Sequence, residues 1–142
     1  TDLIRCVTTA DAIQGSRARL PHDPSLREFH FGTWDGVGFD TVSDWHPDLS
    51  RAYWEGPGHH TPPGGESWND SAARVAAVVQ RINAAHPDAH IIAVAHFGVI
   101  LTQVQAVLGI SATDVLAHKI DNLSVTTLHP KSGHATHINH CP

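Results

Sequence analysis

The stretch HIIAVAHFGVILTQVQAVL, residues 90–108, decides which fold this sequence predicts. Its first half contains the apolar run Ile91 to Ala95, which is rich in branched side chains. A run this short and apolar is typical of a strand buried on both faces, as in a parallel sheet covered by helices. Its second half, Phe97 to Leu108, has apolar residues at helical spacing and is followed by Gly109, which predicts an amphipathic helix closed by a glycine. The stretch therefore indicates an α/β protein.

His96 lies at the junction of this predicted strand and helix. In α/β sheets, ligands bind beyond the carboxyl ends of the strands, and a helix N-terminus there favours anions. His96 is therefore the first candidate catalytic residue. Its position alone does not separate this role from that of a capping or core histidine.

Composition limits the classes of protein that this chain can represent. A chain of 142 residues suits one domain, and its 41% hydrophobic and 16% charged residues are ordinary for a globular protein. The formal net charge of −5, without a Lys/Arg cluster, argues against a nucleic-acid partner. No apolar run approaches the roughly 18–20 residues of a membrane span. Cys6 and Cys141 form no CxxC motif and no disulfide framework, so we expect a cytoplasmic protein.

The 13 histidines raise the question of a metal site. They are scattered, with no HExxH motif and no paired Cys/His spacing. Surface histidines are favoured over a native zinc site, so we expect neither a metal nor another cofactor.

The chain opens on a predicted helix that Thr1 or Asp2 can cap and that Gly15 follows. Arg5 is placed in its first turn, where backbone amides and a cation can bind one anion. The alternative for Arg5 is an ordinary surface arginine.

Glu28 lies in a second informative stretch, LREFHFGTWDG, residues 26–36. Its apolar neighbours are Leu26, Phe29, Phe31 and Trp34. Such surroundings can desolvate a carboxyl group and raise its pKa, as a general acid near neutral pH requires. The alternative is a solvated Glu28 paired with Arg27.

The remaining elements are predicted from capping and turn signals. One or two short helices are expected between residues 39 and 63, ending in a loop at GPGHHTPPGG, residues 56–65. Two Ser-x-x-Asp patterns, beginning at Ser67 and Ser111, predict helix starts, and His86-Pro87 predicts the end of the first of these helices. Residues 123–128 and 134–139 predict two strands joined by a turn at residues 130–133.

Five motifs in this order resemble those of the histidine phosphatase superfamily, the phosphoglycerate-mutase-like family. They are Asp2-Leu3-x-Arg5-x-x-x-Thr9-Ala10, Leu26-Arg27-Glu28-Phe29-x-Phe31-Gly32-x-Trp34-x-Gly36, Gly64-Gly65-Glu66-Ser67, Val94-Ala95-His96-Phe97-Gly98 and Asp121-Asn122-x-Ser124-Val125-Thr126. The resemblance runs from Thr1 to about Leu128. It implies a three-layer α/β fold, with a mostly parallel sheet and helices on both faces.

The resemblance also implies roles for four residues. Arg5 and His96 would bind the phosphoryl group, helped by the backbone N–H at Phe97. Glu28 would be the proton donor to the leaving oxygen. Phosphoryl transfer depends mainly on positioned positive charge and on such a proton, so the physical logic agrees with these roles.

The chain departs from the family at one point. The family's nucleophile is the histidine of an Arg-His-Gly motif on the first strand, and this motif is absent from the sequence. A buried strand at Ile91 to Ala95 also needs parallel neighbours that the other segments hardly supply. We therefore expect an N-terminally incomplete chain, in which residues 1–142 form one phosphoglycerate-mutase-like domain lacking its first strand and helix.

Three functional hypotheses follow from the sequence. The first is a phosphomonoester hydrolase that forms a phosphohistidine and acts on a small phosphate ester. We expect neither a nucleic acid nor a membrane as its partner, and the sequence is compatible with a homodimer. A phosphatase is preferred to a mutase because the segment from Gly36 to Gly64 is short for a lid. The second is a catalytically inactive relative that binds phosphorylated ligands or a protein partner. The third is a small histidine-rich metal-binding protein, which only composition favours.

Overall fold

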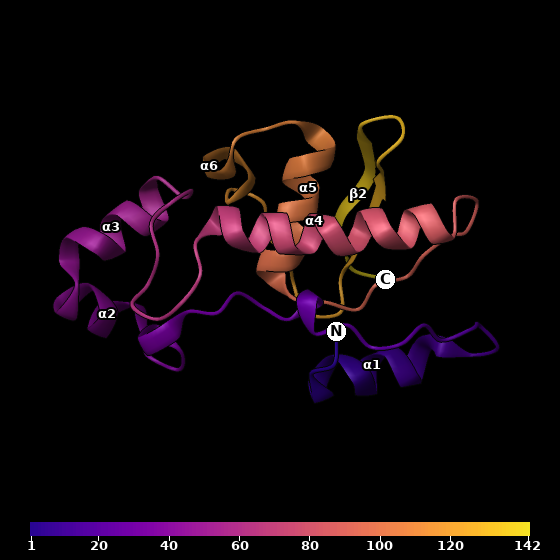
Figure 1. Cartoon of the computed structure of the whole chain (residues 1–142), viewed down its shortest axis with the longest axis horizontal. Coiled ribbons are helices and arrows are strands. Elements are labelled where there is room, and N and C mark those ends of the chain that lie inside the picture. The colour runs from indigo at the N-terminus through magenta and orange to yellow at the C-terminus, as the bar shows by residue number, and fades with distance from the viewer.

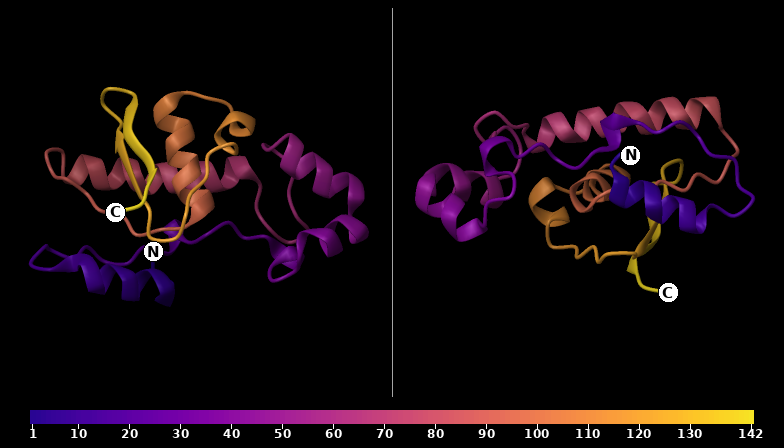
Figure 2. Two further views of the ribbon diagram at one scale, coloured as in Figure 1. Left: turned by 180° about the vertical axis from the view of Figure 1, so that it is seen from behind. Right: turned by 90° about the horizontal axis from the view of Figure 1, so that it is seen from below.

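The computed structural model describes all residues from 1 to 142, and helices dominate it. In chain order the elements are α1 (Ile4–Gln14), η1 (Pro24–Leu26), η2 (Gly32–Trp34), α2 (Phe39–Trp45), α3 (Pro47–Glu55), α4 (Trp68–Ala85), α5 (Phe97–Leu108), α6 (Ala112–Val115), β1 (Val125–His129) and β2 (His134–His140), where η marks a 3-10 helix. The long helix α4 crosses α5, and the β1–β2 hairpin lies on the other side of α5 (Figure 1). Helices α2 and α3 form one end of the molecule, and α1 lies below the rest (Figures 1 and 2).

Capping interactions set the bounds of the later helices as the sequence predicts. The Ser67 side chain accepts a hydrogen bond from the Asp70 amide, the Asp70 carboxylate accepts one from the Ser67 amide, and α4 ends at His86. Ser111 caps α6 in a similar way. Helix α5 ends at Gly109, whose φ of 65° is a left-handed conformation that glycine adopts without strain.

The C-terminal hairpin is also confirmed. Strands β1 and β2 pair antiparallel, with His129 opposite His134 beside the turn, and the register shifts twice along the pair. This hairpin is the complete sheet of the structure. The mostly parallel sheet expected from the sequence is therefore not formed by these residues.

The prediction of a buried strand at Ile91 to Ala95 is wrong for this structure. The segment has no assigned secondary structure, and Ile92 is 51% exposed. A parallel strand needs hydrogen-bonded neighbours, whereas the two strands of this structure pair only with each other. The apolar run thus leads into α5 as an unpaired segment.

The predicted cap of α1 is wrong too. The helix begins after Leu3, with no side chain bonded to its first amides. The Asp2 carboxylate is engaged elsewhere, because it accepts two hydrogen bonds from the Arg27 guanidinium, at 2.9 and 2.5 Å.

Helix α5 is at the centre of the core. Its inner side chains Leu101 and Val104 are fully buried and share a cluster with Phe29, Trp68 and Val115. Two smaller clusters flank this one: Leu26, Val75, Val78 and Val99 lie between α4 and α5, and Trp34, Val42 and Tyr53 lie at the α2–α3 end. The segment that carries Glu28 is therefore anchored on both sides, by Leu26 in one cluster and by Phe29 in another.

No helix of the structure combines the length and the apolar character needed to cross a bilayer.

Candidate active site

The structure brings Arg5 and His96 into direct contact. Arg5 lies in the first turn of α1, and His96 is the residue that precedes α5. Arg5 Nη2 is 3.2 Å from His96 Nδ1. A guanidinium group has donors only, so Nδ1 must accept this hydrogen bond and the proton of the neutral ring must be on Nε2.

His96 is held in its neutral form. The side chain is buried, with 7% of the residue exposed. Burial, together with the positive charge of Arg5, lowers the pKa of His96 to about 4. At neutral pH the imidazole is therefore an uncharged hydrogen-bond donor through Nε2.

Cys6 completes the surroundings of His96, a role that its sequence context did not predict. Its thiol donates to the Ala95 carbonyl oxygen at 3.4 Å, and its Sγ lies 3.6 Å from His96 Nε2. Burial raises the pKa of Cys6, so the group is a thiol at neutral pH. Its position next to Arg5 on α1 was the signal that could have indicated it.

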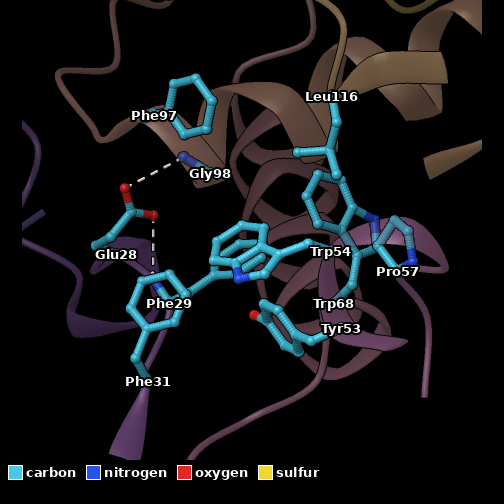
Figure 3. Close-up of a pocket in the computed structure, with 10 residues that line it drawn as sticks. All are labelled: Glu28, Phe29, Phe31, Tyr53, Trp54, Pro57, Trp68, Phe97, Gly98 and Leu116. Carbon is cyan, nitrogen blue, oxygen red and sulfur yellow. Dashed lines mark hydrogen bonds between the residues drawn. The ribbon is translucent and has the colours of Figure 1, made fainter. Parts of the chain in front are cut away.

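Glu28 is bound to the N-terminus of α5. Its Oε2 accepts a hydrogen bond from the Gly98 amide at 3.2 Å, and its Oε1 accepts one from the Phe29 amide at 3.0 Å (Figure 3). Arg27 is paired with Asp2 instead. The alternative of a solvated Glu28–Arg27 pair is therefore wrong.

The pKa of Glu28 is raised above its ordinary value. Burial is the main cause, and it outweighs the hydrogen bonds from the Gly98 and Phe29 amides and the nearby charge of Arg5, which all favour the carboxylate. The surroundings therefore favour the protonated acid over a wider pH range than for an exposed glutamate.

Gly98 is required for the close approach of Glu28 to α5. A Cβ atom at this position would lie 2.8 Å from Glu28 Oε1 and 3.0 Å from the ring of Phe29. Any side chain here would displace the carboxyl group from the helix N-terminus.

Arg74 on α4 holds the Glu28 segment from its other side, a role that no motif in the sequence predicted. Its Nη1 donates to the carbonyl oxygens of Ser25 and Arg27, at 2.7 and 3.1 Å. Its other nitrogens bind the Glu66 carboxylate, which also accepts a hydrogen bond from the His30 amide. Arg74 and Glu66 thus fix the backbone on both sides of Glu28.

Arg5 and Glu28 line the same surface hollow, which has a volume of about 380 Å³. Two other arginines line it, and each has an acidic partner: Arg27 is paired with Asp2 and Arg74 with Glu66. Arg5 has no acidic partner in the structure and is the uncompensated cation of the hollow. His96 does not line the hollow and is next to it through its contact with Arg5.

Phe97 is the first residue of α5, and 45% of the residue is exposed. The next amide, that of Gly98, is already bound by Glu28. Of the two amides, the one at Phe97 is therefore the one open to a ligand.

No group of three or more His, Cys, Asp or Glu side chains lies close enough together to hold a metal ion.

Comparison with known proteins gives consistent results. The chain is 34% identical over 119 residues to a glucosyl-3-phosphoglycerate phosphatase of Mycolicibacterium vanbaalenii, covering 78% of this chain and 52% of that protein. It is 36% identical over 74 residues to a bifunctional protein of Mycobacterium tuberculosis, covering 52% of this chain and 20% of that protein. The chain thus spans between a fifth and about half of the length of these relatives.

Solved structures agree in fold. YhfR of Bacillus stearothermophilus superposes with a TM-score of 0.85 at 24% identity, covering 100% of this chain and 72% of that one. A mycobacterial glucosyl-3-phosphoglycerate phosphatase, solved with inorganic phosphate, superposes with a TM-score of 0.74 at 29% identity, covering 89% of this chain and 65% of that one. The family model of the histidine phosphatase superfamily (branch 1) matches residues 1–140. This chain belongs to the histidine phosphatase superfamily.

Proposed function

We propose that the protein is a phosphomonoester hydrolase of the histidine type. The observation that carries this proposal is the contact of Arg5 with the neutral His96, beside a hollow that Arg5 shares with the buried Glu28. Together they supply an uncompensated cation, an uncharged donor and a proton source.

The residues divide the work as follows. Arg5 binds the equatorial phosphoryl oxygens, and His96 donates to them through Nε2–H, with the Phe97 amide as a further donor. The bond between phosphorus and the leaving oxygen breaks while a nucleophilic histidine bonds to phosphorus. Glu28 gives its proton to the leaving oxygen, so that the product is a neutral alcohol.

The nucleophilic histidine is not among these 142 residues, since the sequence contains no Arg-His-Gly motif. We propose that residues 1–142 are part of one phosphoglycerate-mutase-like domain whose complete form has a three-layer, mostly parallel sheet. The unpaired apolar run Ile91 to Ala95 supports this, because a strand on either side would satisfy its backbone groups. The TM-score of 0.85 to YhfR, of which this chain covers 72%, supports it too.

The substrate in this proposal is a small phosphate ester. The names of two relatives, glucosyl-3-phosphoglycerate phosphatase and putative phosphoserine phosphatase, support the class of reaction. A cytoplasmic location and a homodimer stay predictions from the sequence.

The test is the hydrolysis of 4-nitrophenyl phosphate by the full-length protein, in which the proposal places the nucleophilic histidine, and by its Arg5→Ala and His96→Ala variants. We expect turnover that EDTA does not inhibit and that falls by at least about 100-fold in each variant, as for the loss of a transition-state donor. Turnover that stays unchanged in both variants would contradict the proposed roles.

A catalytically inactive, phosphate-binding relative is the second candidate, because the contact of Arg5 with His96 accounts for phosphate binding whether or not turnover follows. Binding of inorganic phosphate, measured by calorimetry, separates the two. Binding that depends on Arg5 without any turnover would identify a binding protein, whereas turnover would identify the enzyme.

A further inference from the structure

A second, smaller cavity shares Glu28, Phe29 and Phe31 with the hollow that the arginines line. Its volume is about 40 Å³, and Glu28 lines both this cavity and the hollow that holds Arg5. Aromatic side chains surround it, chiefly Phe31, Tyr53, Trp54, Trp68 and Phe97 (Figure 3). We call it the aromatic cavity. The predicted proton donor is thus the boundary between a cationic site and an apolar one.

The aromatic cavity has no cation in its wall. Glu28 is the one carboxylic acid among its lining residues, and the others are aromatic, aliphatic or glycine. Tyr53 is kept neutral because burial raises the pKa of its hydroxyl. A charged ligand group placed here would lose its hydration and find no counter-ion, which is costly.

Tyr53 also offers an unused hydrogen bond. The residue is buried, and its hydroxyl has no partner in the structure. In Figure 3 the hydroxyl is turned toward the side of the cavity formed by Phe29 and Phe31. Buried hydroxyl groups nearly always have a partner. The Tyr53 hydroxyl oxygen is itself covered in this structure, so a ligand atom would bond to it only after the neighbouring aromatic side chains move.

Partly exposed side chains form the solvent side of the cavity. Trp54 and Phe97 are on its solvent side, with 38% and 45% of each residue exposed. Tyr53 and Trp54 are arranged edge to face, with ring centroids 5.0 Å apart and an interplanar angle of 85°. A volume of about 40 Å³ admits the edge of a ring or a short alkyl group, so the entry of a whole ring requires Trp54 and Phe97 to move.

We propose that the aromatic cavity receives the leaving group, and that the protein selects phosphate monoesters of uncharged, aromatic or apolar alcohols. This inference rests on the proposed function, because it takes the phosphoryl group to be at Arg5 and the leaving oxygen to be at Glu28. Esters whose alcohol carries a carboxylate are disfavoured, since Arg27 and Arg74 are already paired with acids.

Two phosphonates test the proposal without turnover. Phenylphosphonate and methylphosphonate carry the same anionic head and differ only in the group that would enter the cavity. We expect phenylphosphonate to bind about tenfold more tightly, in line with the burial of part of an aromatic ring. The Trp54→Ala variant should reduce this preference to about twofold or less.

Trp45→Ala is the matched control, because Trp45 is an exposed tryptophan on α2 that does not line the cavity. It should keep the full preference. Circular dichroism of both variants establishes that each is folded.

The outcomes separate the two proposals. If both phosphonates bind equally well, or if the two tryptophan variants behave alike, the aromatic cavity is not the leaving-group site, while the phosphate site at Arg5 stands. If neither phosphonate nor inorganic phosphate binds, the proposed function fails and this inference fails with it.

Discussion

Arg5 Nη2 and His96 Nδ1 are 3.2 Å apart, although 91 positions separate the two residues in the chain. The contact joins the first turn of α1 to the residue before α5. Cys6, the one buried residue of α1, lies beside it. These contacts therefore fix the first turn of α1 beside His96, while the rest of this helix is largely exposed.

The contact predicts a histidine that resists protonation. We expect NMR titration to give a pKa of about 4 for His96. Arg5→Gln should raise this pKa only in part, because burial is the larger cause. A value at or above the ordinary 6.5 in the natural sequence would contradict the buried contact.

The same lowered pKa predicts how stability depends on pH. The unfolded chain binds the His96 proton more readily than the folded one, so the folded state loses stability as the pH falls from about 6.5 toward 4. The contribution is on the order of 3 kcal/mol. Urea unfolding of the protein and of His96→Gln at several pH values measures it, because the variant should lack this part of the pH dependence.

Glu28→Gln should slow turnover most for esters with poor leaving groups. An amide cannot supply the proton that a poorly acidic alcohol needs, and general acids typically contribute about 10²–10⁴-fold. The comparison is kcat for phenyl phosphate against 4-nitrophenyl phosphate. Asp40→Asn is the control, since this exposed carboxylate on α2 lines neither the hollow nor the aromatic cavity. An equal loss on both esters would count against a proton donor.

Gly98→Ala tests the placement of Glu28 on α5. The new methyl group would lie 2.8 Å from Glu28 Oε1, so we expect kcat to fall about tenfold and the free energy of unfolding to fall by about 1–3 kcal/mol. Gly38→Ala is the matched control, because a Cβ there meets no atom within 4 Å. Equal behaviour of the two variants would show that Glu28 does not depend on this approach.

Arg74→Leu should destabilise the protein far more than Arg81→Leu. Both arginines are on α4 and both are paired with an acid, but 24% of the Arg74 side chain is exposed against 64% for Arg81. Losing Arg74 leaves two carbonyl oxygens and Glu66 without their donor, which costs about 2–4 kcal/mol. Losing the exposed pair of Arg81 costs about 0–1 kcal/mol. Thermal unfolding of the two variants gives the comparison.

Local signals in the sequence were sufficient for most of the helices and for the hairpin. Ser67 and Asp70 cap α4, and Gly109 ends α5, because capping depends on residues only a few positions apart. The same holds for the turn at Gly133 between β1 and β2. The strand at Ile91 to Ala95 was predicted wrongly because an apolar run shows that burial is favourable but not whether a partner strand is present.

By itself, the sequence determined the family and the three residue types that a phosphoryl site needs: an arginine, a histidine and a carboxylic acid. Motif order and residue chemistry can be read directly from the sequence. Only the tertiary structure decided that Arg5 contacts His96, that Glu28 binds the α5 N-terminus rather than Arg27, and that Arg74 holds its loop. These are contacts between residues 49 to 91 positions apart. Their geometry follows from how α1, α4 and α5 fold against one another, and no local pattern in the chain encodes it.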